Sequence, residues 1–153
     1  MSTPDEDLLS DPLYGSSALI VIAGGICKEA ADLLRAGNFP AVIDKATTGI
    51  QFLEKGMANN PLDLRAILGL YLFDLYVDRG LAYGKSGPNA QALQDIETAL
   101  AMPAAYQNAQ MLGLLQNLKA QAKAQIKPVV VPQAQSSSSQ PQKKGFFTRL
   151  LGG

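Results

Sequence analysis

Hydrophobic residues recur every three or four positions along most of residues 16–126, a spacing typical of amphipathic α-helices. The spacing predicts five helices, over about residues 18–36, 39–56, 62–83, 89–101 and 103–125. The first helix places its larger apolar residues near one stripe: Ile22, Ile26, Ala30, Leu33 and Leu34. The third helix is apolar on more than one face, so we expect it to be the central helix of an all-α domain.

The segments between the helices carry turn and cap residues. Ser16 offers an N-cap for the first helix, and Gly37 with Asn38 is a left-handed signal for its end. Pro40 suits the first turn of the second helix, and Pro103 suits the start of the fifth. These breaks predict antiparallel helical hairpins, each joined by a short turn.

The composition divides the chain into four parts. Residues 1–15 are acidic and contain two prolines, which favours a flexible leader, and residues 16–126 form the predicted helical domain. Gln, Ser and Pro dominate residues 127–144, which predicts a disordered linker. Residues 145–153 are apolar and basic again, so we expect a short amphipathic C-terminal motif there.

Formal charge is unevenly distributed although the whole chain has a net charge of zero. Residues 1–126 hold nine Lys and Arg against 13 Asp and Glu, a net charge of −4, while residues 127–153 hold four basic residues and no acid. Residues 1–126, with more acidic than basic residues, lack the basic excess that nucleic-acid-binding domains usually show. We therefore expect no nucleic-acid partner for the domain, and an acidic surface as a natural target for the tail.

Candidate chemistry is sparse. The chain has no His, which is the commonest general base and metal ligand, and its one cysteine, Cys27, excludes an internal disulfide. Asp74 and Asp78 share a helix face beside Arg79, where a solvated or ion-paired surface is the expected role. No set of residues has a catalytic, metal-binding or cofactor-binding spacing, so we expect a protein that is not an enzyme and binds no cofactor.

The segment from Tyr76 to Ala99 has a regular series of small, aromatic and large apolar residues. Its positions are Tyr76, Gly80, Tyr83, Gly87, Ala92, Ile96 and Ala99. This series resembles a tetratricopeptide repeat over about residues 70–103, and a degenerate copy covers about residues 23–56. The resemblance implies stacked helical hairpins and a protein-binding role, with an unrelated helical bundle as the alternative fold.

The resemblance also indicates which residues would line a concave groove. The corresponding positions are Cys27, Ala31, Val77 and Leu81, in place of the Lys, Arg and Asn with which some members of the family bind carboxylates. None of the four residues here can hold a carboxylate. The resemblance therefore implies an apolar groove that suits a hydrophobic helix or strand, or one that another part of the chain fills.

The C-terminal motif has two pairs of apolar residues at helical spacing, Phe146 with Leu150 and Phe147 with Leu151, next to Arg149. So short a segment does not hold a helix alone in water, so we expect it to fold on a target. Three targets remain open: a partner protein, an anionic membrane surface, or the chain's own groove. An idle, disordered end is the alternative to all three.

These features predict a non-catalytic adaptor or scaffold protein that binds one or more proteins. Its repeat-like body would contact one partner, and its tethered motif would recruit another. Two alternatives are an assembly factor that the basic, aromatic tail holds at a membrane, and a self-associating structural subunit with an idle tail. The acidic N-terminus shows no secretory signal, so we expect a cytoplasmic protein, either free or at the surface of a membrane or a protein assembly.

Overall fold

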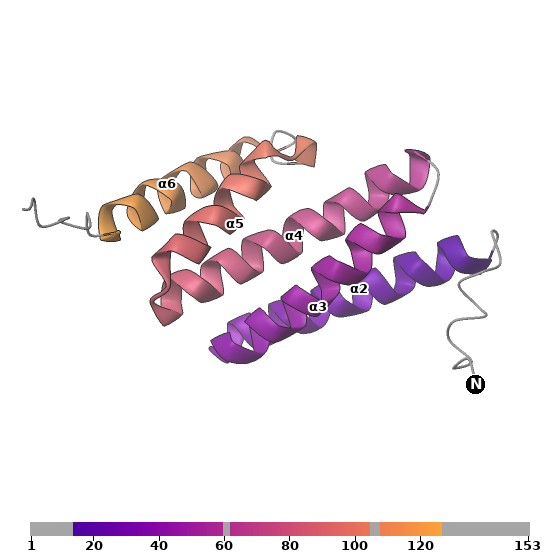
Figure 1. Cartoon of the computed structure of the whole chain (residues 1–153), viewed down its shortest axis with the longest axis horizontal. Helices are drawn as coiled ribbons and strands as arrows, with labels where there is room; N and C mark the ends of the chain where they lie inside the picture. Colours follow the sequence, from indigo (N-terminus) through magenta and orange to yellow (C-terminus); the bar gives the residue numbers. More distant parts are fainter. Residues whose placement is uncertain (1–13, 60–61, 105–107, 127–153) are drawn as a thin grey trace, which may run out of the picture.

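The computed structural model describes residues 14–59, 62–104 and 108–126, and these ranges contain five α-helices and no strand (Figure 1). The helices are α2 (Tyr14–Arg35), α3 (Phe39–Ala58), α4 (Leu62–Ser86), α5 (Asn89–Ala101) and α6 (Ala109–Gln125). The all-α prediction is confirmed for this part of the chain. The predicted linker, the predicted C-terminal motif and most of the predicted leader lie outside the described residues.

The turn between α2 and α3 follows from its sequence. Gly37 adopts a φ of +73°, a conformation open to glycine and strained for other residues. The N–H groups of Gly37 and Asn38 donate to the carbonyls of Leu34 and Leu33, each at 3.0 Å, which closes the end of α2. The Asn38 side chain then accepts from the N–H of Ala41 at the start of α3. The predicted helix break at Gly37 is confirmed.

The next two helix boundaries lie beyond their predicted positions. Helix α4 runs to Ser86 instead of ending near residue 83, and the chain turns at Gly87, whose φ is +114°. Helix α6 begins at Ala109, so the prediction that Pro103 starts it was wrong. The Asn108 side chain accepts from the N–H groups of Gln110 and Met111, a cap that a proline has no side-chain oxygen to form.

The helices follow one another as antiparallel neighbours, so α2, α4 and α6 run in the same direction (Figure 1). Helix α4 packs against α2, α3 and α5, which confirms the prediction that this helix is central. Helix α6 packs against α5 and covers the second hairpin. The described part of the chain is therefore a five-helix bundle whose stacked hairpins are compatible with a helical repeat.

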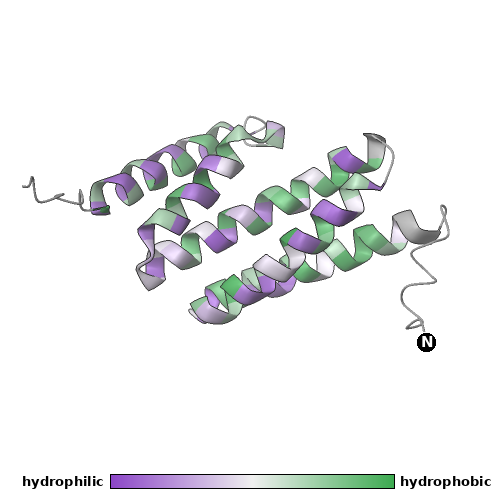
Figure 2. Cartoon of the chain, viewed as in Figure 1, coloured by the Kyte–Doolittle hydropathy of each residue, from purple (hydrophilic) through white to green (hydrophobic). Residues whose placement is uncertain are grey.

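Two apolar clusters hold the bundle together. Leu53, Leu68 and Leu75 are completely buried in the first cluster, which fills the space between α2, α3 and α4. The second cluster joins α4, α5 and α6 and consists of Phe73, Val77, Ile96, Ala99 and Leu115. Figure 2 shows the result along each ribbon, where hydrophobic residues alternate with hydrophilic ones at helical spacing.

Glycine allows the helices to approach closely at two positions. A Cβ atom on Gly49 of α3 would lie 2.6 Å from Ile26 Cγ2 and 2.8 Å from Leu75 Cδ1. A Cβ atom on Gly80 of α4 would lie 3.2 Å from Ile96 Cγ1 of α5. Of the other predicted repeat positions, Tyr83 is half-buried in α4, Gly87 lies in the turn after α4, and Ala92 and Ala99 are buried on α5.

Candidate functional site

The central helix presents a stripe of three exposed residues, Ile67, Leu70 and Asp74, and the half-buried Asp78, which we call the α4 face. The spacing of three or four residues places all four on one side of α4. Leu68 and Leu75, each the next residue after a member of this stripe, lie on an adjacent side of the helix and are buried in the core. Ile67 is 43% exposed and Leu70 is 44% exposed, so two large apolar side chains meet solvent in the middle of the bundle.

The second half of the α4 face is acidic. Loss of hydration, followed by the charge of Asp74, raises the pKa of Asp78 to about 6, while Arg35 of α2 acts in the opposite direction. The Asp74 side chain is solvent-exposed by area, but protein atoms around its carboxylate remove enough water to raise its pKa as well. A raised pKa means that the negative charge of each carboxylate lacks stabilisation. A cation bound near both carboxylates would supply it.

Cys27 lies on α2 beside this acidic region. Its Sγ donates to the backbone carbonyl of Tyr71 at 3.4 Å. Burial, with smaller contributions from Asp74 and Asp78, raises the pKa of the thiol to about 12. Because the thiolate is the reactive form of cysteine, Cys27 acts as a packing residue here. No three His, Cys, Asp or Glu side chains in the described ranges gather closely enough to bind a metal ion.

The four predicted groove residues have different environments. Cys27 and Val77 are buried in the two apolar clusters, and Ala31 is half-buried on α2. Leu81 is half-buried and lines a pocket of about 160 Å³ between α4, α5 and α6. This volume is below the ~300 Å³ at which small-molecule sites begin, so the pocket suits a single side chain. Leu81 follows Asp78 by three residues, so it lies on the same side of α4 as the α4 face.

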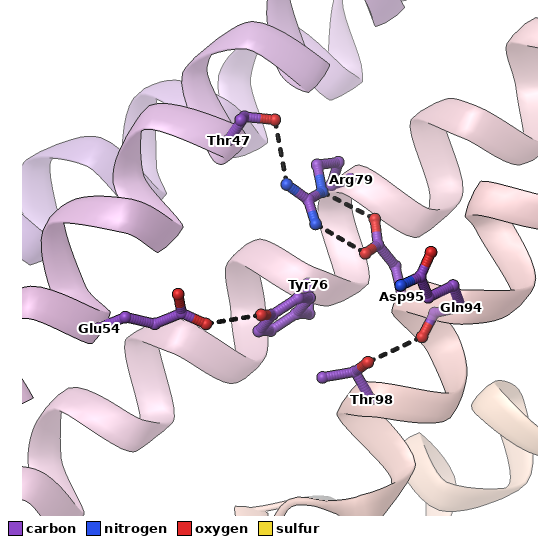
Figure 3. Close-up of polar contacts among 7 residues, drawn as sticks. All are labelled: Thr47, Glu54, Tyr76, Arg79, Gln94, Asp95 and Thr98. Atoms are coloured by element: carbon purple, nitrogen blue, oxygen red, sulfur yellow. Dashed lines mark hydrogen bonds and ion pairs between the residues drawn. The ribbon is translucent and has the colours of Figure 1, made fainter.

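Arg79 forms the polar centre of the bundle (Figure 3). Its Nε and Nη2 donate to the two carboxylate oxygens of Asp95 on α5, each at 2.8 Å, and its Nη1 donates to Thr47 on α3 at 3.0 Å. The guanidinium also lies 5.5 Å from the ring centre of Tyr76, whose hydroxyl donates to Glu54 at 2.8 Å. Arg79 is therefore directed away from Asp74 and Asp78, and it ties three helices together.

Asp95 is the residue in this network that the sequence analysis missed. Its side chain is 5% exposed, and it lies on the same face of α5 as the buried residues Ala92, Ile96 and Ala99. A charged residue inside an apolar stripe was the available signal, since carboxylates are almost never buried unless they are paired. All buried side-chain nitrogen and oxygen atoms of the described residues have a hydrogen-bond partner, so this network has a structural role.

Comparison of the chain with protein-family models, with curated proteins and with solved structures gives no match. Membership of the tetratricopeptide family is therefore not shown. The structure supports the coarser description, a bundle of packed helices compatible with a helical repeat. None of the described helices combines the length and the apolarity needed to cross a lipid bilayer.

The predicted tail residues Phe146, Phe147, Arg149, Leu150 and Leu151 lie outside the described residues.

Proposed function

We propose that this chain is a non-catalytic adaptor whose helical body binds one protein through the α4 face and whose C-terminal motif recruits a second partner. The observation that carries the proposal is the α4 face itself. Exposed Ile67 and Leu70 adjoin two carboxylates, Asp74 and Asp78, on the most enclosed helix of the bundle.

The composition of the α4 face favours a basic, amphipathic peptide as its ligand. Single exposed apolar residues are common on protein surfaces. Two apolar residues on one stripe have the spacing of three or four residues at which a bound amphipathic helix makes its contacts. A Lys or Arg of the ligand would lower the pKa of Asp74 and Asp78 towards the usual range of carboxylates. Apolar contact and charge thus act together over the four residues of this face.

The recruiting role of the tail is tested by a pull-down from the source cell with the full chain and a Phe146→Ala/Phe147→Ala/Leu150→Ala variant. Soluble and membrane fractions are kept separate. Loss of one protein supports the adaptor, whereas loss of membrane association alone supports the membrane-bound assembly factor. An unchanged set of partners contradicts a recruiting tail and leaves the helical body as the binding element.

A self-associating subunit is the second candidate, because the two outer helices also expose apolar side chains. Val21 on α2 is 73% exposed, and Leu114 on α6 is 47% exposed. Sedimentation of the full chain over a range of concentrations tests this candidate. A rise in mass that a Val21→Ser/Leu114→Ser variant abolishes would establish it, and a constant monomer mass would exclude it.

A further inference from the structure

The described residues end at Ile126, beside α4, the helix that carries the α4 face. Gln125, the last residue of α6, lines the same pocket as Gly84 and Lys85, which lie in the last turn of α4. Residues after Ile126 therefore start beside the C-terminal end of α4. At about 1.5 Å per helical residue, Asp78 lies roughly 10 Å back along α4 from Lys85, and Ile67 lies roughly 27 Å back.

We propose that the C-terminal segment, residues 143–153, binds the α4 face of its own chain and so competes with an outside ligand for that surface. Residues 127–142 lie between Ile126 and this segment, and as a flexible coil these 16 residues span about 22 Å on average. The whole α4 face thus lies within its reach. A tether of this length holds the segment at an effective concentration in the millimolar range, so even a weak contact is populated.

The order of residues in the segment matches their order along the face. Moving from the C-terminal end of α4, a peptide meets first the carboxylates of Asp78 and Asp74, and then the apolar side chains of Leu70 and Ile67. Along the segment, Lys143 and Lys144 come first, and the apolar pairs follow: Phe146, Phe147, Leu150 and Leu151. The segment as a helix is about 12 Å long from Lys143 to Leu151, close to the roughly 16 Å from Asp78 to Ile67.

Charge favours this occupant over a neutral peptide. Residues 127–153 hold four basic residues and no acid, whereas residues 16–126 hold nine basic and nine acidic residues, so the complementary charge is local to Asp74 and Asp78. Asp74 on the same helix and Arg35 on α2 act on the pKa of Asp78, and Asp78 acts in turn on Cys27 of α2. Lys85 follows two turns later on the same side of α4. Neither Asp74 nor Asp78 forms a salt bridge with another described residue, since Arg35 pairs with Asp32 and Arg79 pairs with Asp95. A lysine from the segment therefore finds two unpaired carboxylates.

Paramagnetic broadening in the full chain tests the contact. A nitroxide is attached to a Gly152→Cys variant in which Cys27→Ala removes the native thiol, and amide spectra are recorded with the label oxidised and reduced. We expect the amides of residues 67–78 to lose most of their intensity, equally at high and low protein concentration. The broadening should disappear with Phe146→Ala/Leu150→Ala and with Asp74→Lys, and remain with Asp44→Lys, an exposed acid on α3 outside the face.

Three results would overturn the proposal. Absence of broadening at residues 67–78 would show that the segment does not dock there. Broadening that persists in Asp74→Lys would place the contact on another surface. A further control mixes nitroxide-labelled chain without ¹⁵N and ¹⁵N-enriched chain without nitroxide. Broadening of the ¹⁵N-enriched chain in this mixture would show that the segment of a second copy is the occupant. The proposed adaptor function does not depend on this contact, because partner binding is measured separately by pull-down.

Discussion

Arg79 on α4 and Asp95 on α5 form a two-pronged ion pair, with both N–O distances at 2.8 Å and with side chains only 16% and 5% exposed. The hydrogen bonds that Arg79 donates to Asp95 raise the pKa of Arg79 above its ordinary value. Because its guanidinium is fully engaged there and by Thr47, Arg79 does not neutralise its neighbours Asp74 and Asp78. Because Arg79 is paired with Asp95, the carboxylates of Asp74 and Asp78 keep the α4 face acidic.

Loss of one partner of this pair should strongly destabilise the bundle. Breaking a buried ion pair typically costs about 3–5 kcal/mol because the other charge stays buried without compensation. We expect Asp95→Ala to lower the free energy of unfolding by about this amount in urea denaturation of the full chain. Asp44→Ala, at an exposed carboxylate, is the control and should change it by less than about 0.5 kcal/mol. A loss below about 1 kcal/mol for Asp95→Ala would contradict a buried role for the pair.

The raised pKa of Asp78 makes stability depend on pH. Its folded pKa, about 6, lies above the ordinary value of 3.8 for an aspartate, so the folded state binds more protons than the unfolded state between these two pH values. Stability therefore falls as pH rises from about 4 to about 6, by at most about 3 kcal/mol before solvent screening reduces it. We expect Asp78→Asn to raise the melting temperature at pH 7 and to leave it nearly unchanged at pH 3.5.

Asp44→Asn is the matched control for that comparison, since it removes one negative charge from an exposed site on α3. If Asp78→Asn stabilised the chain equally at both pH values, or no more than Asp44→Asn, loss of hydration at Asp78 would not be the cause.

Two glycines should respond in opposite ways to the same substitution. Gly49→Ala places a Cβ atom 2.6 Å from Ile26 and 2.8 Å from Leu75, and overpacking of this kind costs about 1–3 kcal/mol. A Cβ atom on Gly69 of α4 would meet no atom within 4 Å. Gly69→Ala should therefore raise the free energy of unfolding by up to about 1 kcal/mol, through the higher helix propensity of alanine. Thermal unfolding of both variants checks the prediction, and stabilisation by Gly49→Ala would contradict the close packing of α2, α3 and α4.

The thiol of Cys27 should be almost inert in the folded chain. With a pKa of about 12 instead of 9.0, its thiolate fraction at pH 8 falls by roughly three orders of magnitude. We expect modification by a thiol reagent such as DTNB to be very slow in buffer and fast in 8 M urea, the control in which the thiol is exposed. Equal rates in both solutions would show that Cys27 is accessible.

Turn and cap residues, which act within a few positions of the chain, predicted one helix break correctly and one helix start wrongly. The turn at Gly37 and Asn38 could be predicted because a left-handed residue and a side-chain cap act within a few positions. The predicted start of α6 was wrong because it rested on Pro103 and overlooked the side-chain cap that Asn108 supplies. Asn108 accepts from two backbone N–H groups at the start of α6, which the side chain of a proline cannot do.

Contacts between helices were harder to predict. Ile22 was placed on one stripe of the first helix with Ala30, yet Ile22 is 42% exposed. Leu19, Ala23 and Cys27 face the core beside Ala30. The pairing of Arg79 with Asp95, 16 residues away, was missed in favour of the neighbouring carboxylates. Small residues such as Ala23 set how closely two helices approach, and this approach decides which side of each helix remains exposed.

The most direct test of a binding role for the α4 face is a quantitative pull-down with Leu70→Ser and Ile22→Ser, two changes at apolar residues of nearly equal exposure, 44% and 42%. Both variants should remain folded, as their melting curves will show. We predict that Leu70→Ser loses a protein that the full chain and Ile22→Ser both retain. Equal recovery of every partner by the two variants would contradict the α4 face as the binding surface.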